Sequence, residues 1–376
     1  MKGTIQSNKP RILLVVTDLG PGGSQAMNIY LARELSNRGW IVDIAVLFDR
    51  WRVLGENLCN NLNITILGRA RFPHKIMLPL RLLPMARKVD VVLGGAEQAS
   101  TTYAWLAAFC AGKPFVAWTH SCLHLHLGSV SRIDRFIIRT LYRETRYVVF
   151  TSAGARDSLL ICLGEKPPHA AWHVVENFLP KTSITPEAKA IDPLLLSRPV
   201  ILGVGRLAKE KAFDRLIRAH AKLLKMGLDQ HLVILGEGPK RTELLRKAQR
   251  LGVAATTFLP GHVPNVPDWL EHATIFALCS KYEGLPLVIL EAMAAGTPIV
   301  AMDCPSGPRE MLQDGYAGLL VPEGDETAFT EALAALLTSP ELRARYSERG
   351  KQRAAYYCPE RIVPQWESLF KEIAGS

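Results

Sequence analysis

The feature that most constrains the fold of this chain is a rhythm of short apolar runs separated by longer segments with helical periodicity. In the first half the runs are RILLVVTD, IVDIAVLF, VDVVLGG, PFVAWTH and YVVFTS, and segments such as SQAMNIYLARELSNRG and ASTTYAWLAAFCAG lie between them. Short buried runs that alternate with helices are typical of βα repeats, which build parallel sheets. The sequence therefore predicts an α/β fold.

The alternation of apolar runs and helical segments is interrupted once and then resumes. A polar, proline-bearing stretch, KTSITPEAKAIDPLLLSRP, precedes a second series of apolar runs, from VILGVGRL and HLVILGEGP to PIVAMD and GLLVP. A chain of 376 residues is long enough for two domains of ordinary size. We therefore expect one Rossmann-like domain over 1–180, a linker over 181–198 and a second Rossmann-like domain over 199–358. Because open α/β sheets bind ligands beyond the carboxyl ends of their strands, we expect a cleft where two such sheets face each other.

Cysteine usage and hydropathy exclude several classes. The seven cysteines are scattered and show no CxxC spacing, so neither a thiolate zinc site nor a redox pair is expected. No apolar stretch reaches the roughly 18 residues that a membrane-spanning helix requires. The N-terminal apolar run is shorter than that of a signal peptide. We expect reduced thiols and a cytoplasmic location.

The net charge of +10 is concentrated in the first half of the chain, because residues 1–180 hold 21 Lys and Arg against 12 Asp and Glu. The excess gathers in segments 68–88 and 131–146, where Arg alternates with Ile, Leu and Phe. Such segments suit an anionic membrane surface, and they equally suit solvated faces of ordinary helices. Nucleic acid is not expected, because no platform of stacking aromatic residues accompanies the charge. A peripheral association with the inner face of the cell membrane is the expectation.

The most specific motif is SKYEGLPLVILEAMAAGTPIVAMD, residues 280–303. Its carboxylates, Glu283 and Glu291, lie eight positions apart across a Gly-Pro turn. Pro286 fits the first turn of a helix that Gly296 closes, so free backbone N–H groups near the helix start can bind an anion. Glu291 lies further along the helix, within reach of paired hydroxyls such as those of a ribose. A loop carboxylate and a solvent-facing helix residue are the alternative. The turn residues expected to bind are Gly284, Leu285 and Pro286.

The pattern E-G-L-P, whose Glu is separated by seven residues from a following E-A-M-A-x-G-x-P-I-V-A, resembles the group 1 family of retaining GT-B glycosyltransferases. The resemblance extends to a Gly-Gly loop near the start, a His after a first-domain strand, GVGRLAKEKAFDRLI and LVILGEGP. It implies the GT-B fold, with two Rossmann-like domains facing across a cleft and a C-terminal helix, about 359–376, that belongs with the first domain. The stretch DCPSGPRE resembles members that build bacterial surface polysaccharides.

Two cations follow the first strand of the second domain. In GVGRLAKEKAFDRLI, Arg206 and Lys211 flank a helix start, and fixed cations there can stabilise a diphosphate leaving group. The resemblance implies this role, although Ala212 stands where the family usually has Gly. Two surface cations beside a helix are the alternative. The Asp-x-Asp motif that chelates a metal in another glycosyltransferase fold does not occur in this sequence. We expect no metal requirement.

The first domain contributes a glycine-rich loop and a histidine. In DLGPGGSQ, Gly20, Gly22 and Gly23 permit positive φ, although the spacing is not that of a dinucleotide-binding GxGxxG loop. The resemblance places Gly22 and Gly23 beneath the donor diphosphate, with a plain tight turn as the alternative. It also places His120 near the transferred sugar and its phosphate. The run HSCLHLH lacks the helical context and carboxylate partner of zinc motifs, so a metal site is not expected.

A last group lies in loops that would close on the nucleotide base through backbone contacts: Gly236, Gly261 and His262. Together these features predict a retaining, metal-independent glycosyltransferase. It would move a hexose or N-acetylhexosamine from a nucleotide sugar, most simply a UDP-sugar, to a lipid-linked or saccharide acceptor. Glu283 would hold sugar hydroxyls and Glu291 the ribose. The alternatives are a nucleotide-sugar epimerase or a phosphorylase of the same fold, and a non-catalytic protein that binds nucleotide sugars.

Overall fold

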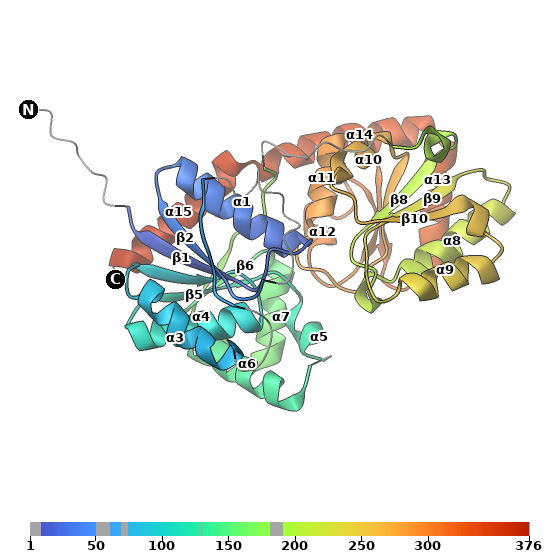
Figure 1. Cartoon of the computed structure of the whole chain (residues 1–376). Coiled ribbons are helices and arrows are strands. Elements are labelled where there is room, and N and C mark those ends of the chain that lie inside the picture. The colour runs from blue at the N-terminus through green and yellow to red at the C-terminus, as the bar shows by residue number, and fades with distance from the viewer. Residues whose placement is uncertain (1–8, 50–60, 69–73, 129, 181–190, 376) are drawn as a thin grey trace, which may run out of the picture. The chain divides into compact units, whose positions relative to one another are not determined.

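The chain forms two compact units, each built around one parallel sheet (Figure 1). The computed structural model describes residues 9–49, 61–68, 74–128, 130–180 and 191–375, without the side chains of 74–76. The first unit joins Met1–Asn177 to Pro359–Ser376, and the second is Phe178–Cys358. Most of the expected linker, 181–190, lies outside the described residues, and the rest holds a 3₁₀ turn, η1 (Pro193–Leu196).

The first unit has a seven-stranded sheet in the order β3-β2-β1-β4-β5-β6-β7, and every pairing is parallel. Its central strands are the apolar runs seen in the sequence, and β1 is buried along nearly its whole length. The edge strands β3 and β7 were not predicted, because both are short and neither is fully buried. The strands are β1 (Arg11–Val16), β2 (Ile41–Val46), β3 (Asn63–Ile66), β4 (Val91–Gly94), β5 (Phe115–Thr119), β6 (Tyr147–Phe150) and β7 (Ala171–Val174).

Helices cover both faces of this sheet. Helix α1 lies on one face, where it contacts α15, and α3, α4, α6 and α7 lie on the other, where neighbours contact each other (Figure 1). The helices are α1 (Gly23–Asn37), α3 (His74–Ala86), α4 (Ala99–Ala111), α5 (Leu123–Leu127), α6 (Arg132–Glu144), α7 (Ala153–Leu163) and α15 (Pro359–Gly375). Two of them begin at serine caps, since Ser131 and Ser152 accept hydrogen bonds from backbone N–H groups three residues on.

The last helix, α15, is fixed to the first unit by aromatic and polar contacts. Trp366 packs edge-on against Trp118, with ring centroids 4.7 Å apart, and both side chains are almost fully buried. Trp40 donates an indole N–H hydrogen bond to Glu367 at 2.6 Å. The core of the first unit is thus completed by a helix that follows the whole second unit in the sequence.

The second unit has a six-stranded parallel sheet in the order β10-β9-β8-β11-β12-β13. All six strands match apolar runs predicted from the sequence. The strands are β8 (Val200–Val204), β9 (His231–Leu235), β10 (Thr257–Gly261), β11 (Ile275–Leu278), β12 (Ile299–Asp303) and β13 (Leu319–Pro322).

The helices of the second unit follow these strands in alternation. As predicted, Gly296 ends α11 in the left-handed conformation, with φ 76°. The helices are α8 (Phe213–Lys225), α9 (Arg241–Arg250), α10 (Val266–His272), α11 (Leu287–Ala295), α12 (Pro308–Met311), α13 (Glu326–Thr338) and α14 (Pro340–Ala354). Three further 3₁₀ turns are η2 (Lys209–Lys211), η3 (Ala254–Thr256) and η4 (Ala355–Tyr357).

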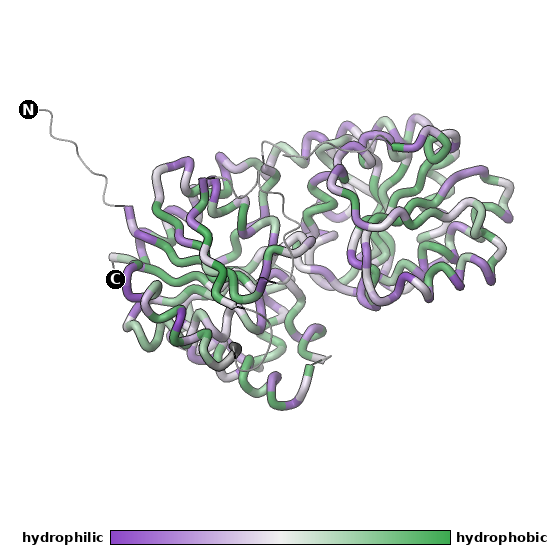
Figure 2. Tube along the Cα trace, viewed as in Figure 1, coloured by the Kyte–Doolittle hydropathy of each residue, from purple (hydrophilic) through white to green (hydrophobic). Residues whose placement is uncertain are grey.

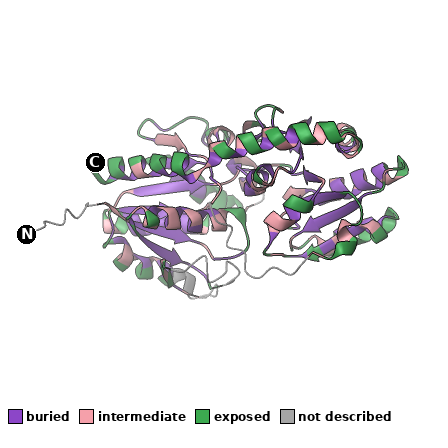
Figure 3. Cartoon of the chain, turned by 90° about the horizontal axis from the view of Figure 1, so that it is seen from above, coloured by how far each residue is buried: buried purple, intermediate pink, exposed green. Residues whose placement is uncertain are grey.

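Hydropathy and burial agree within each unit. The strands are coloured as hydrophobic in Figure 2 and as buried in Figure 3, and the helices alternate between the two kinds of surface. This is the expected pattern for parallel sheets that are covered on both faces. Among the described residues, no helix combines the length and the apolar content needed to cross a bilayer.

Candidate functional site

An ion pair at the carboxyl edge of the second sheet joins Lys211 to Glu283. Lys211 follows β8 and Glu283 follows β11, and these two strands are neighbours in the sheet. Parallel neighbours end at the same edge, so the two loops meet there. Lys211 Nζ lies 2.6 Å from Glu283 Oε1, and the side chains are only 22% and 9% exposed. The structure therefore joins two of the predicted site residues into one sheltered ion pair.

The backbone around Lys211 is held in an unusual conformation. Ala212 ends η2 in the left-handed region, with φ 49° and ψ 35°. The family usually has glycine here, and alanine in this region costs about 1–2 kcal/mol. Cys279 Sγ donates a hydrogen bond to the Lys211 carbonyl at 3.2 Å. The chain thus retains the backbone turn that glycine would favour.

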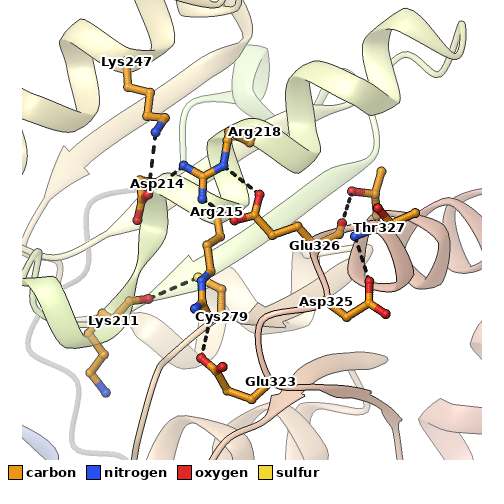
Figure 4. Close-up of polar contacts among 11 residues, drawn as sticks. Lys211, Asp214, Arg215, Arg218, Lys247, Cys279, Glu323, Asp325, Glu326 and Thr327 are labelled. Atoms are coloured by element: carbon orange, nitrogen blue, oxygen red, sulfur yellow. Dashed lines mark hydrogen bonds and ion pairs between the residues drawn. The ribbon is translucent and has the colours of Figure 1, made fainter.

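An ion-pair network fixes the start of α8, directly after Lys211 (Figure 4). Arg218 pairs with Asp214 and with Glu326 at the start of α13, and its hydrogen bond lowers the pKa of Glu326. Arg215 pairs with Glu323 at 2.8 Å. Figure 4 shows the Lys211 side chain pointing away from this network. The network therefore supports the loop and leaves the Lys211 ammonium to Glu283.

Arg206, the second predicted cation, is placed differently. Its side chain is 68% exposed and pairs with Glu210 at 2.7 Å. The backbone carbonyl of Glu210 in turn accepts a hydrogen bond from Lys281 N at 2.8 Å, which ties the two loops together again. An exposed pair of this kind is weak. Arg206 can therefore exchange Glu210 for an anionic ligand at small cost.

Glu291 lies in the second turn of α11 and is half-buried. It makes no hydrogen bond or ion pair within the described part of the chain. Protein atoms surround the carboxyl group, and this burial raises its pKa to about 7. A solvent-facing helix residue would show no such shift. The structure therefore favours a carboxylate kept in a sheltered site without a protein partner.

The turn between Glu283 and α11 is built by close backbone contacts. Gly307 has φ 89°, and a Cβ added there would lie 2.3 Å from the Gly284 carbonyl oxygen. Ser306 Oγ donates a hydrogen bond to the same oxygen at 3.0 Å. Pro286 is the N-cap and not the first helical residue, so α11 starts at Leu287. The first N–H groups of the helix have no intrahelical acceptor and can bind an anion.

The loops after β8, β9 and β10 pack backbone against backbone. Gly236 N donates a hydrogen bond to the Gly261 carbonyl at 2.8 Å. Gly236 has φ 132°, and an added Cβ would lie 2.0 Å from the Gly205 carbonyl oxygen. These predicted residues are thus brought together with the β8 loop that leads to Arg206. His262 is exposed at the end of this cluster.

In the first unit, His120 directly follows β5 and packs on Trp118, with ring centroids 4.3 Å apart. Burial lowers its pKa to about 4, against the opposing effects of the Glu97 charge and a hydrogen bond with the Gly95 backbone. Within the described residues its Nε2 has no hydrogen-bond partner, so the Gly95 bond uses Nδ1. A neutral ring that donates through Nδ1 presents Nε2 as an acceptor.

Glu97 was missed by sequence reasoning. Its carboxylate accepts hydrogen bonds from the backbone N–H of His120 and, at 2.7 Å, of Ser121, and a third at 3.1 Å from the Ser121 hydroxyl. It therefore sets the position of the turn that presents His120. The available signal was a carboxylate three residues beyond the end of the neighbouring strand, in VDVVLGGAE. Gln98 beside it has φ 64°, a strained conformation for a side-chain-bearing residue.

The glycine-rich loop does not use the positive φ that its glycines permit. None of Gly20, Gly22 and Gly23 has positive φ, and Gly22 is extended, with φ −178°, as the N-cap of α1. The chain passes straight from this extended residue into the helix. An added Cβ at Gly22 would meet only the flexible end of Gln25, at 2.4 Å. The groups of this loop that can bind a ligand are the backbone N–H groups at the N-terminus of α1.

The neighbouring histidines are hydrogen-bonded to the protein. His124 contacts Ser158 Oγ through its backbone N and its Nδ1, at 3.0 and 2.9 Å. His126 Nε2 lies 2.6 Å from Gln98 Nε2. In the parts of the chain that the structure describes, no three His, Cys, Asp or Glu side chains form a group that could hold a metal ion.

Comparison with known proteins matches both units to glycosyltransferases. Residues 185–353 match the family described as "Glycosyl transferases group 1", and residues 21–180 match "Glycosyltransferase Family 4". The lipopolysaccharide core biosynthesis glycosyltransferase LpsE of Rhizobium meliloti is 27% identical over 88% of this chain and 90% of its own length. The N-acetylgalactosamine-N,N'-diacetylbacillosaminyl-diphospho-undecaprenol 4-alpha-N-acetylgalactosaminyltransferase of Campylobacter jejuni is 31% identical over 65% of each chain. Several curated relatives are matched over less than two thirds of their own length.

Solved structures show a similar fold. Anabaena HepE, crystallised with UDP and glucose, is similar with a TM-score of 0.80 over 96% of this chain and 100% of its own, at 18% sequence identity. Two parallel-sheet α/β units with this similarity define a GT-B fold, as predicted. With both units matched to glycosyltransferase families, the chain belongs to the group 1 glycosyltransferases.

Proposed function

We propose that this chain is a metal-independent, retaining glycosyltransferase of bacterial polysaccharide or glycolipid biosynthesis. It transfers a hexose or N-acetylhexosamine from a UDP-sugar to a lipid-linked or saccharide acceptor. The observation that carries the proposal is the ion pair of Lys211 and Glu283 at the carboxyl edge of the second sheet. A cation and a carboxylate held there provide one group for a diphosphate and one for sugar hydroxyls.

The donor occupies the second unit in this proposal. Lys211 and Arg206 bind the diphosphate, together with the N-terminal N–H groups of α11. Glu283 accepts hydrogen bonds from sugar hydroxyls, and Glu291 accepts them from the ribose. The glycine-packed loops at Gly236 and Gly261 border the nucleotide base. Two cations at the diphosphate supply the charge that a divalent metal would otherwise supply, which supports metal independence.

The first unit contributes His120 and the start of α1, after Gly22 and Gly23. A neutral His120 with Nε2 as acceptor suits a hydrogen bond from a sugar hydroxyl. In the transfer step, the acceptor oxygen forms a bond to the anomeric carbon on the face that the UDP oxygen leaves. The bond to UDP breaks, and the acceptor proton passes to a phosphate oxygen of the leaving UDP. Positioned charges stabilise the developing diphosphate, and no protein nucleophile is needed.

Named relatives support the choice of donor and acceptor. HepE is similar in fold and was crystallised with UDP-glucose as well as with UDP. The name of the Campylobacter relative gives an acceptor linked to undecaprenol through a diphosphate. The LpsE relative is named for lipopolysaccharide core biosynthesis. These names make a UDP-sugar and a lipid-linked acceptor the first substrates to test.

The test is a donor screen with the purified full chain. Release of nucleoside diphosphate from UDP-, GDP- and ADP-sugars is followed with and without bacterial membranes, and with and without EDTA. We expect release from a UDP-sugar that depends on the membrane fraction and persists in EDTA. The anomeric configuration of the product, read by NMR, tests retention.

Other outcomes would point elsewhere. Conversion of the donor sugar without any acceptor would favour an epimerase, and dependence on inorganic phosphate would favour a phosphorylase. Tight binding of one nucleotide sugar with no turnover in any arm would favour a non-catalytic binding protein. Loss of activity in EDTA that returns with added Mg²⁺ would overturn metal independence.

The pKa of Glu291 gives the proposal a pH signature. A carboxylate accepts ribose hydrogen bonds better than a carboxyl group, and the Glu291 pKa is about 7. UDP affinity, measured by calorimetry, is therefore expected to rise about tenfold between pH 6 and pH 8. The Glu291→Gln variant is expected to bind UDP about 10- to 100-fold more weakly and without this rise.

The same substitution is expected to stabilise the ligand-free protein at high pH. Folding raises the Glu291 pKa, so the folded state loses stability as pH rises from the unfolded value to about 7. The Tm of Glu291→Gln should exceed that of the natural chain at pH 8 and match it at pH 4. Glu331→Gln, at an exposed site on α13, is the control and should change neither affinity nor Tm. A wild-type UDP affinity that is flat with pH would contradict the assignment.

A further inference from the structure

Most of the large apolar side chains that the described part of the first unit exposes lie on the helices of one face. Of those that are exposed in its described part, all except Ile41 and Ile66 lie on α3, α4, α6 and α7, the helices that share one face of the sheet. Monomeric proteins seldom expose so many together unless the surface has a partner. The residues on these helices are Met77, Leu80, Phe109, Ile133, Phe136, Ile137, Leu160 and Ile161.

The helix α6 has the clearest pattern. Ile133, Phe136 and Ile137 are 73%, 72% and 43% exposed, and their spacing of three and four residues places them on one stripe of the helix. The opposite stripe, which includes Ile138 and Leu141, is buried in the core. The outward stripe therefore has no role in the packing of α6 against the rest of the unit.

Arginines flank this apolar stripe. Arg132 and Arg139 lie seven residues apart on one side of it, and neither has an ion-pair partner in the described part of the chain. Arg135 and Arg143 donate hydrogen bonds to the carbonyls of Leu127 and Leu163, which neutralise no charge. The flank of α6 therefore remains positively charged.

We propose that α6 docks this protein on an anionic phospholipid bilayer. Ile133, Phe136 and Ile137 enter the boundary between headgroups and acyl chains, and Arg132 and Arg139 bind lipid phosphates. An exposed apolar stripe beside uncompensated cations is the pattern of helices that lie in a membrane interface. A protein partner would need an apolar surface and, beside it, anionic groups that match the arginines. An anionic bilayer provides apolar acyl chains and negatively charged headgroups over its whole surface. This binding is independent of the proposed reaction and goes beyond it.

The distribution of charge along the chain supports membrane docking through the first unit. Residues 178–358 hold 22 Lys and Arg against 20 Asp and Glu, so the second unit is nearly neutral. The predicted basic segment 68–88 adds exposed Met77 and Leu80 on α3, although 69–73 lie outside the described residues. The excess of positive charge and the exposed apolar side chains thus belong to the same unit.

The experiment is co-sedimentation of the full chain with sucrose-loaded vesicles of phosphatidylcholine alone or with 30 mol% phosphatidylglycerol. We expect strong binding only to the anionic vesicles, weakened by 0.5 M NaCl. Phe136→Asp should lower the partition coefficient about tenfold or more. The double variant Arg132→Gln with Arg139→Gln should lower it by about tenfold, since each cation near the surface contributes about fivefold at most.

Matched variants come from the second unit. Met226→Asp changes a side chain that is 59% exposed, and Arg246→Gln with Arg250→Gln removes two exposed cations of α9. These controls should bind anionic vesicles like the natural chain, and circular dichroism should show every variant folded. Equal binding by the Phe136 and Met226 variants, or failure of the natural chain to bind anionic vesicles, would overturn the proposal. Neither result depends on whether a sugar is transferred.

Discussion

Replacement of Lys211 with alanine is expected to lower kcat about 100- to 1000-fold with the donor that the chain uses. The cation matters most when the bond to the diphosphate breaks, because negative charge on the leaving group is then largest. Its site is sheltered, since the Lys211 side chain is 22% exposed and its partner Glu283 is buried. Electrostatic stabilisation is stronger in such a site than in open water. The measurement is initial rate of UDP release at saturating donor.

A matched control and a double variant separate charge from folding. Lys209→Ala removes an exposed lysine of the same 3₁₀ turn and should leave kcat within about twofold. Loss of Lys211 also leaves the Glu283 carboxylate without its partner, which should cost about 1–3 kcal/mol of stability. Adding Glu283→Gln should restore part of the Tm and none of the activity. A double variant that recovers kcat along with Tm would show that Lys211 acts only in folding.

Gly236→Ala is expected to destabilise the second unit by about 3 kcal/mol or more, a fall in Tm of roughly 10 °C. Its φ of 132° suits glycine, and an added Cβ would lie 2.0 Å from the Gly205 carbonyl oxygen. That oxygen belongs to the backbone of the loop before Arg206, so it cannot rotate away as a side chain could. The measurement is differential scanning calorimetry with and without UDP.

Gly227→Ala provides the comparison. Gly227 also has positive φ, 84°, but nothing lies within 4 Å of an added Cβ. It should therefore cost only the roughly 1 kcal/mol of left-handed strain. The difference between the two variants isolates the close backbone packing of the β8 and β9 loops. Equal Tm values for the two would mean that this packing is loose and that Gly236 is needed only for its φ.

The central strands of both sheets were predicted from the sequence, because short apolar runs bounded by turns are typical of the buried strands of a parallel sheet. The strands β3 and β7 were not, because polar residues interrupt their sequences, NITI and AWHV, and neither strand is fully buried. Helix ends were predicted where one residue type determines them, as with Gly296. The backbone conformation of the glycine-rich loop could not be predicted, since glycine permits positive φ without requiring it.

The site residues, like the strands, could be predicted only in part from the sequence. Lys211 and Glu283 were singled out from their motifs, yet their pairing depends on which strands are neighbours, and the sequence does not state strand order. The backbone role of Glu97 depends on the neighbouring positions of β4 and β5 in the same way. The raised pKa of Glu291 required knowledge of the surrounding packing. Sequence motifs thus indicated the chemical groups, and topology determined their partners.

The contact of α15 with the first unit has a consequence for protein synthesis. Residues 178–358 form the second unit and leave the ribosome before α15 (Pro359–Gly375), against which Trp118 and Trp40 pack. During translation the second unit can therefore complete its core first, although the first unit begins the chain. Until α15 emerges, an aromatic surface of the first unit remains uncovered. Chaperones that bind exposed apolar residues of nascent chains are therefore expected to bind this surface until α15 emerges.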